Sequence, residues 1–263
     1  MTVPVPLIEM RNISKSFGAV VALRQVSLAV AAGEVVGLVG DNAAGKSTLM
    51  KILSGVYTPD AGEIVLDGRP QAFATPMDAR GAGIEMVYQD FALVPELSVT
   101  QNIFLGRELL QGGLRSRFID KPRMRERATH LIERLGLRVP PVDTPVRAIS
   151  GGQQQAVAIA RATAFDARLV IMDEPTANLA AAAIGKVRAA IGRLKSHGVA
   201  VVVISHRIED VLETADRAVV LKHGMVVGER RINETGGDEL VHMIVAGQDP
   251  LRPAGGAAGA PPG

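Results

Sequence analysis

The sequence predicts an α/β protein built on a mainly parallel sheet flanked by helices, and two observations support this prediction. Three short, β-branched and continuously apolar runs have the composition of central strands that are covered on both faces. They are EVVGLVG (34–40), LVIMDE (169–174) and VAVVVISH (199–206). The first run passes through a glycine-rich loop into KSTLMKILSG, which reads as a helix, so strand and helix alternate as such a sheet requires.

Two further regions depart from this alternation. GEIVLDGRPQ (62–71) alternates apolar and polar residues and ends its first half at Asp67-Gly68, which predicts a hairpin of an N-terminal antiparallel β subdomain. The region of about residues 92–162 is different, because three of its segments have helical patterns. These are SVTQNIFLG, KPRMRERATHLIERLGL and GGQQQAVAIARATAF. They predict a helical subdomain inserted into the α/β core.

Domain organisation follows from the absence of an internal repeat. We expect a single domain over residues 1–250. The remaining residues, 251–263, include RPAGGAAGAPPG and have almost no large apolar side chain, so we expect a disordered tail.

Composition excludes several classes of protein. The 263 residues include 47% hydrophobic and 21% charged residues, which is typical of a globular chain. A formal charge of only +2 gives no reason to expect a nucleic-acid partner. The chain has no cysteine, and the segment MTVPVPLIEMRN lacks the pattern of a signal peptide. No apolar run approaches the roughly 20 residues that span a bilayer, so any membrane role requires a partner.

A phosphate-binding loop is the first chemical motif. GLVGDNAAGKSTLMKILSG (37–55) contains the pattern G-x-x-x-x-G-K-[ST], between an apolar strand and a helix. Backbone N–H groups and a helix N-terminus would converge there on phosphate oxygens, which predicts a P-loop NTPase core. Lys46 would reach the β- and γ-phosphates of ATP, and Ser47 would bind Mg²⁺. The expected phosphate-binding residues are Gly40, Asp41, Asn42, Ala43, Ala44, Gly45, Lys46, Ser47 and Thr48.

Acidic residues end a second apolar run. Asp173 closes LVIMDE, where it could hold Mg²⁺ directly or through water, and Glu174 could polarise the attacking water. His206 ends the third run. A lone histidine there is more often structural, but with a phosphate loop present a contact to the γ-phosphate or the water is the better interpretation.

A second anion-binding segment is predicted at ISGGQQQAVAIARA (149–162). Ser150, Gly151, Gly152 and Gln153 open a helix whose bare N–H groups could bind phosphate. An ordinary N-cap followed by a flexible turn explains this segment equally well when it is taken alone.

Together these motifs resemble the ATP-binding subunits of ABC transporters, in family order over residues 6–247. ISGGQ is similar to the LSGGQ signature, and EPTANLA occupies the D-loop. The resemblance implies that Gln89 in VYQDFALVPELSV is the Q-loop glutamine. It is then expected both to bind Mg²⁺ and to take part in catalysis. It implies that Phe17 stacks on adenine and that Glu174 and His206 are catalytic. It also implies that two cassettes close head to tail, so that Ser150 faces the partner's ATP.

A finer resemblance points to the carbohydrate-import branch of this family. It rests on GKSTLMKILSGVYTPDAGEIVLDG, LVPELSVTQNIFLGRE and MIVAGQ. It implies an ATP-hydrolysing subunit on the cytoplasmic face of the inner membrane that drives uptake of a sugar. The implied partners are a second cassette (expected to be an identical chain), permease subunits and, indirectly, an extracytoplasmic sugar-binding protein. A cassette for amino acids or lipids, and a soluble ABC protein of translation or DNA repair, are the alternatives.

Two positions depart from the family pattern. Ala180 and three further alanines follow Leu179, where the D-loop usually has an aspartate, so we expect a weaker contact across the dimer. Ala43 stands where many such loops have glycine. If this position has a positive φ, its Cβ costs about 1–2 kcal/mol. If φ is negative, alanine is neutral or stabilising. In either case we expect Ala43 to tune nucleotide affinity at most.

Overall fold

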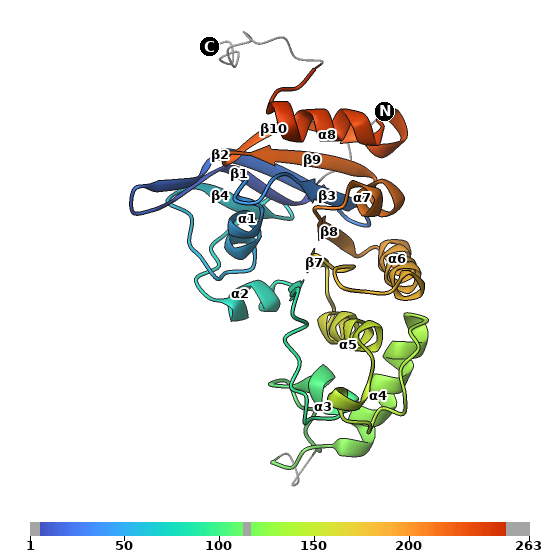
Figure 1. The fold of residues 1–263 in the computed structure, drawn as a ribbon. Helices are drawn as coiled ribbons and strands as arrows, with labels where there is room; N and C mark the ends of the chain where they lie inside the picture. Colours follow the sequence, from blue (N-terminus) through green and yellow to red (C-terminus); the bar gives the residue numbers. More distant parts are fainter. Residues whose placement is uncertain (1–5, 113–116, 251–263) are drawn as a thin grey trace.

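Two sheets and a group of helices make up the computed structural model, which describes residues 6–112 and 117–250 (Figure 1). The larger sheet has the strand order β10-β9-β3-β8-β7-β6, and all neighbouring pairs are parallel except β9 with β10. Its strands are β3 (Val35–Val39), β6 (Ile84–Val87), β7 (Leu169–Asp173), β8 (Ala200–Ile204), β9 (Arg217–Lys222) and β10 (Met225–Arg231). The three predicted central strands are therefore confirmed, and they are adjacent in the sheet.

The second sheet is the predicted antiparallel subdomain. Its order is β2-β1-β4-β5, and the strands are β1 (Pro6–Phe17), β2 (Val20–Ala31), β4 (Ala61–Leu66) and β5 (Arg69–Gln71). The pairing of β4 with β5 around Asp67 and Gly68 confirms the predicted hairpin. Helix α1 (Lys46–Leu53) packs in the core shared by the two sheets, because its apolar residues share one buried cluster with residues of β1 and β3.

Several helices lie between β6 and β7, as the inserted subdomain requires. They are α3 (Val99–Phe104), α4 (Lys121–Arg134), the short 3₁₀ helix η2 (Val146–Ala148) and α5 (Gly151–Thr163). Asp120 caps α4 by accepting a hydrogen bond from the Arg123 N–H, and Ser98 and Gln101 form a capping box on α3. Figure 1 shows this subdomain at the end of the molecule opposite α8. The expected subdomain boundaries at 92 and 162 stay a prediction.

The remaining elements cover the larger sheet. They are α2 (Pro76–Gly81), α6 (Ala181–Ser196), α7 (Ile208–Thr214), the 3₁₀ helix η3 (Ile232–Glu234) and α8 (Gly237–Ala246). In residues 6–112 and 117–250, no helix has the length and hydropathy that a membrane span requires. The predicted disordered tail lies outside the described residues.

Candidate functional site

The two glycines of the phosphate loop are required by its backbone. Gly40 has a φ of 150°, and a Cβ there would lie 2.1 Å from the carbonyl oxygen of Leu221 on the neighbouring strand β9. Gly45 has a φ of 104°, and its Cβ would lie 2.8 Å from the Ala22 carbonyl oxygen. Any other residue at these positions would move the loop away from β9 or β2, and thereby change the direction of its N–H groups.

Ala43 adopts the more costly of the two conformations considered above. Its φ is 65°, in the left-handed region, where a Cβ is unfavourable. The next residue, Ala44, is buried and is not among the residues with positive φ in the described chain. The backbone strain of the alanine is therefore local to position 43 among the two alanines of the loop.

Lys46 begins helix α1 and lies across the loop. Its Nζ donates hydrogen bonds to the carbonyl oxygens of Gly40, at 2.7 Å, and Asp41, at 2.9 Å. These two carbonyl oxygens accept the hydrogen bonds that the Lys46 ammonium group would donate to phosphate oxygens of a bound nucleotide. Burial lowers the pKa of Lys46, although the negative charges of Glu174, Asp41 and Asp173 oppose this shift. A largely buried ammonium group at the start of a helix suits a polyphosphate ligand.

A cavity of about 380 Å³ beside the loop gathers most of the predicted residues. It is bounded on one side by Val20, Val21 and Ala22 of β2, and on another by Ile204 at the end of β8. The predicted site residues that line it are Asn42, Ala43, Ala44, Gly45, Lys46, Ser47, Thr48, Gln89, Asp173 and Glu174. Residues from three separate parts of the sequence thus meet in one place.

The ligand set of this cavity fits a hydrated magnesium ion. Ser47, Gln89 and Asp173 supply a hydroxyl, an amide and a carboxylate to the same space. No group of three or more His, Cys, Asp or Glu residues that could hold a metal occurs in the described ranges. Mg²⁺ typically takes one or two carboxylates together with waters and substrate phosphates, so it needs no such cluster. Burial and the adjacent Glu174 raise the pKa of Asp173, while Lys46 and Lys51 oppose the shift.

Glu174 is held by two contacts at the end of β7. It has a φ of 49°, its N–H donates to the Ile204 carbonyl oxygen at 2.9 Å, and its Oε1 accepts from the backbone N–H of His206 at 3.0 Å. His206 Nδ1 lies 2.8 Å from Oε2, but this contact lacks hydrogen-bond geometry. Within the described residues, buried Oε2 has no hydrogen-bond donor. An attacking water could be that donor.

The signature segment lies outside this cavity. Ser150 is the exposed N-cap of α5, and its N–H donates to Gln153 Oε1 at 2.9 Å. Gly152 is required by packing, because a Cβ there would lie 2.7 Å from the Cβ of Ala183 in α6. The residues of the signature are not among those that line the cavity at the phosphate loop. The two predicted phosphate-binding ends of this chain therefore do not share one ligand within a single copy.

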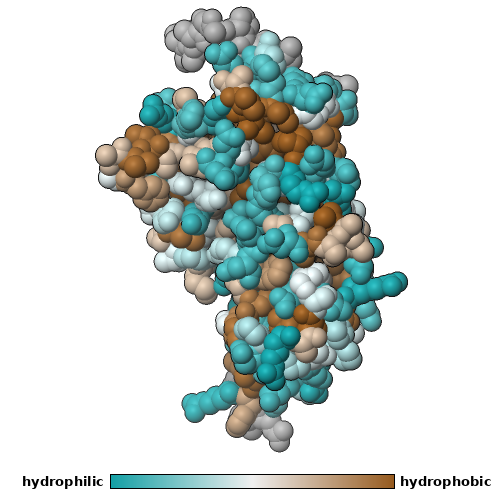
Figure 2. Space-filling view, viewed as in Figure 1, coloured by the Kyte–Doolittle hydropathy of each residue, from teal (hydrophilic) through white to brown (hydrophobic). Residues whose placement is uncertain are grey.

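Phe17 lies at the end of the β1–β2 hairpin, next to the cavity wall but not in it. Its ring packs edge-on against Tyr57 at 5.1 Å between centroids, and the residue is 43% exposed. Val20 and Val21 are also exposed there, and Figure 2 shows apolar side chains gathered at this end of the molecule. The position suits stacking on a base, and that role stays a prediction.

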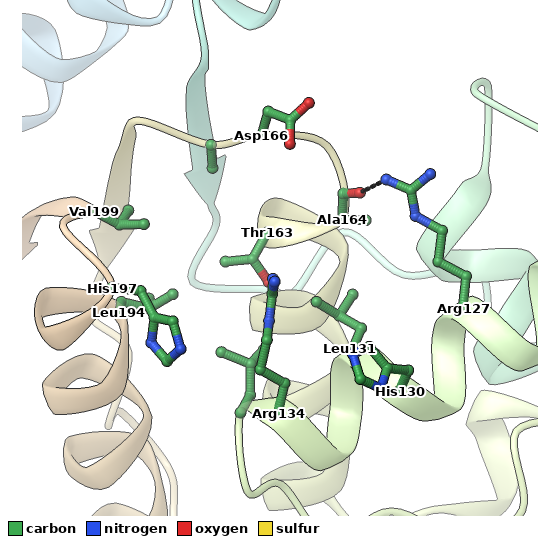
Figure 3. Close-up of a pocket in the computed structure, with 12 residues that line it drawn as sticks. Arg127, His130, Leu131, Arg134, Thr163, Ala164, Asp166, Leu194, His197 and Val199 are labelled. Carbon is green, nitrogen blue, oxygen red and sulfur yellow. Dashed lines mark hydrogen bonds between the residues drawn. The ribbon is translucent and has the colours of Figure 1, made fainter.

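A second cavity, of about 330 Å³, lies between α4 and the C-terminal ends of α5 and α6 (Figure 3). Figure 3 shows Arg134 extending towards the end of α5, with His130 and His197 on either side. Arg127 donates to the Ala164 carbonyl oxygen at 2.9 Å, so it caps the C-terminus of α5. None of the predicted site residues lines this cavity.

Sequence patterns missed residues that support the site. Arg161 of α5 donates hydrogen bonds to the carbonyl oxygens of Phe91 and Ala92, which follow Gln89 by only a few positions. An arginine inside the apolar run AVAIARATAF was a signal, because such a charge requires a buried partner.

Comparisons with known proteins identify the family of this chain. The family model described as ABC transporter matches residues 23–177. A xylose/arabinose import ATP-binding protein of Sulfolobus acidocaldarius is 44% identical over 91% of this chain and 94% of its own length. A ribose import ATP-binding protein of Streptomyces avermitilis is 44% identical over 93% of this chain but only 48% of its own length, so the chain spans about half of that relative.

Solved structures show the same fold. An ATP-binding cassette of an ABC transporter in its ADP conformation has a TM-score of 0.78 and 27% identity, covering 94% of this chain and 96% of its own. A dimeric bacterial ABC transporter cassette has a TM-score of 0.73 and 27% identity, covering 86% of this chain and 98% of its own. The predicted α/β fold with its two subdomains is therefore confirmed.

Proposed function

The chain belongs to the ABC transporter family of ATP-binding proteins, and from this premise we propose that it is the ATP-hydrolysing subunit of a sugar importer. The cavity at the phosphate loop is the observation that supports hydrolysis, because it joins Lys46 and Ser47 to Asp173 and Glu174. The import of a sugar is supported by the names of the relatives, which import xylose, arabinose or ribose.

Each residue of the cavity has a distinct role in this proposal. Lys46 and the loop N–H groups hold the β- and γ-phosphates, while Ser47, Asp173 and Gln89 hold Mg²⁺. Bound Mg²⁺ would neutralise charge on the phosphates. Glu174 orients the attacking water and draws a proton from it through Oε2, and His206 fixes the Glu174 carboxylate.

The second cassette completes the site. Ser150 is exposed and lies outside the cavity of its own chain, so its helix is available to a phosphate held by another copy. Ala180 offers no carboxylate at the start of α6, and this predicts a looser dimer than an aspartate would give. The second cassette is expected to be an identical chain.

The membrane partners follow from the same proposal. The chain would work at the cytoplasmic face of the inner membrane, on permease subunits that receive sugar from an extracytoplasmic binding protein. None of its described helices can span a bilayer, so the permease would have to supply the pathway.

Dimer formation tests this proposal. Glu174→Gln keeps the shape of the side chain but removes the charge that takes the proton, so hydrolysis should slow by about 10²–10⁴-fold while ATP still binds. Uncleaved ATP should then hold two chains together. We expect the Glu174→Gln protein with Mg-ATP to elute as a dimer at high protein concentration.

A second serine provides a control with the same change of side chain and charge. Adding Ser150→Arg should return the Glu174→Gln protein to a monomer, because the side chain fills the anion site. Adding Ser196→Arg, at the exposed end of α6, should leave the dimer intact. A dimer that both arginines leave unchanged would show that the signature does not act across the interface.

A further inference from the structure

A buried aspartate joins the two loops that hold the proposed catalytic pair. Asp210 of α7 is only 2% exposed. Its Oδ1 accepts from Arg188 Nη2 of α6 at 2.6 Å, and its Oδ2 accepts from the hydroxyl of Thr176. Arg207 Nε approaches Oδ2 at 3.6 Å, and Arg188 also pairs with Glu213. The carboxylate is therefore compensated by Arg188 of α6, Arg207 at the N-cap of α7 and Thr176 of the loop before α6, as a buried charge requires.

The position of this network in the chain is what matters. Thr176 lies two residues after Glu174, in the loop between β7 and α6, and it is 3% exposed. Asp210 lies four residues after His206, in the first part of α7. Glu174 and His206 meet between these same two loops. The two loops are thus connected twice, by the exposed contact between Glu174 and His206 and by the buried hydrogen bond between Thr176 and Asp210.

We propose that Asp210, through Thr176, is a positioning residue for the Glu174–His206 pair. The side chain of His206 is 62% exposed, and its Nδ1 lies 2.8 Å from Glu174 Oε2, so little packing around the ring holds it in place. Glu174 has a left-handed backbone that neighbouring structure must hold. The buried bond sets the separation of the two loops, and with it the direction of Glu174 Oε2. This inference rests on the proposed function, in which Glu174 activates water.

Variants of Thr176 test the inference with little change of shape. Thr176→Val removes the hydroxyl and keeps the volume, whereas Thr176→Ser keeps the hydroxyl. We expect Thr176→Val to lower kcat for ATP about tenfold with KM changed less than about twofold, because the phosphate loop that binds ATP is untouched. Thr176→Ser should stay within about twofold of the native kcat.

The matched control is a second buried threonine. Thr163 donates its hydroxyl to the carbonyl oxygens of Ile159 and Ala160 in its own helix, so Thr163→Val loses the same atoms without loosening the two loops. We expect native kcat and KM for Thr163→Val, measured with full-length protein at a temperature where circular dichroism shows each variant folded. A native kcat for Thr176→Val, or an equal loss in Thr163→Val, would overturn the inference.

A double-mutant cycle and one further variant complete the experiment. Asp210→Asn and Thr176→Val should be strongly non-additive in kcat if they act through one bond, and additive losses would refute the inference. Glu174→Gln is assayed alongside them. If its turnover is native, the catalytic assignment in the proposed function is wrong and the inference falls with it. If Glu174→Gln is inactive while Thr176→Val is native, only the inference is wrong.

Discussion

Replacing Ala43 with glycine is expected to stabilise the protein, because this residue has a left-handed φ of 65°. Relief of the Cβ contact is worth about 1–2 kcal/mol, and the greater freedom of glycine in the unfolded chain costs about 0.4–1 kcal/mol. The difference of the midpoints is about 0.8 kcal/mol. For a domain of this size, that corresponds to a rise of about 2–3 °C in melting temperature.

The neighbouring alanine is the control for this measurement. Ala44 is 3% exposed and has no positive φ, so Ala44→Gly relieves no backbone strain. It removes a buried methyl group and raises the entropy of the unfolded chain, and both effects destabilise the folded protein. Scanning calorimetry of nucleotide-free protein should therefore show opposite shifts for the two glycine variants. Melting temperatures that fall together would show that the positive φ of Ala43 is not a source of strain.

Activity of the same variant addresses the loop's function. We expect Ala43→Gly to change the KM for ATP by no more than about tenfold, or about 1.4 kcal/mol, because the glycines that shape the loop are Gly40 and Gly45. A rise in activity of about a hundredfold or more, equivalent to about 2.7 kcal/mol, would mean that Ala43 had disabled the native site.

Two further predictions concern the loop lysine and the signature glycine. Lys46→Ala should abolish phosphate release from ATP, because the β- and γ-phosphates lose their positioned counter-charge. Lys51→Ala, at the other end of α1, is the control and should remain active. Native turnover of the Lys46 variant would refute the assignment of the phosphate loop. Gly152→Ala should cost about 1–3 kcal/mol in thermal unfolding, because its Cβ would lie 2.7 Å from that of Ala183. Adding Ala183→Gly should restore most of this loss, and a failure to do so would place the cause elsewhere.

Features set by local pattern were predictable from the sequence. The continuous apolar runs of β3, β7 and β8 predict strands covered on both faces, and the turn at Asp67-Gly68 predicts a hairpin. The glycines at 40 and 45 were predictable from the motif, although the atoms that exclude a Cβ belong to β9 and β2. Local sequence thus identified the requirement without identifying its cause.

Features set by distant contacts were not predictable. The sign of φ at Ala43 was left open, because alanine tolerates both conformations in different surroundings. The left-handed φ of Glu174 depends on a hydrogen bond to Ile204, 30 positions away in the chain. The bond between Thr176 and Asp210 spans 34 positions, and neither residue stands out in its own segment. Such contacts depend on the packing of whole elements.

The order of strands explains how these scattered residues act together. The phosphate loop follows β3, Glu174 follows β7 and His206 follows β8. In the sheet, β8 lies between β3 and β7, and all three are parallel, so their carboxyl ends meet at one edge. His206 therefore emerges between the proposed phosphate-binding residues and the proposed catalytic acid Glu174, although it comes last in the sequence. Gln89 follows β6, the next strand beyond β7, and closes the same edge from the far side. A ligand in crevices of this kind contacts several strand ends at once. The proposed magnesium ligands and the proposed catalytic pair thus come from separate loops, and we expect their relative positions to depend on contacts between those loops, such as the hydrogen bond from Thr176 to Asp210.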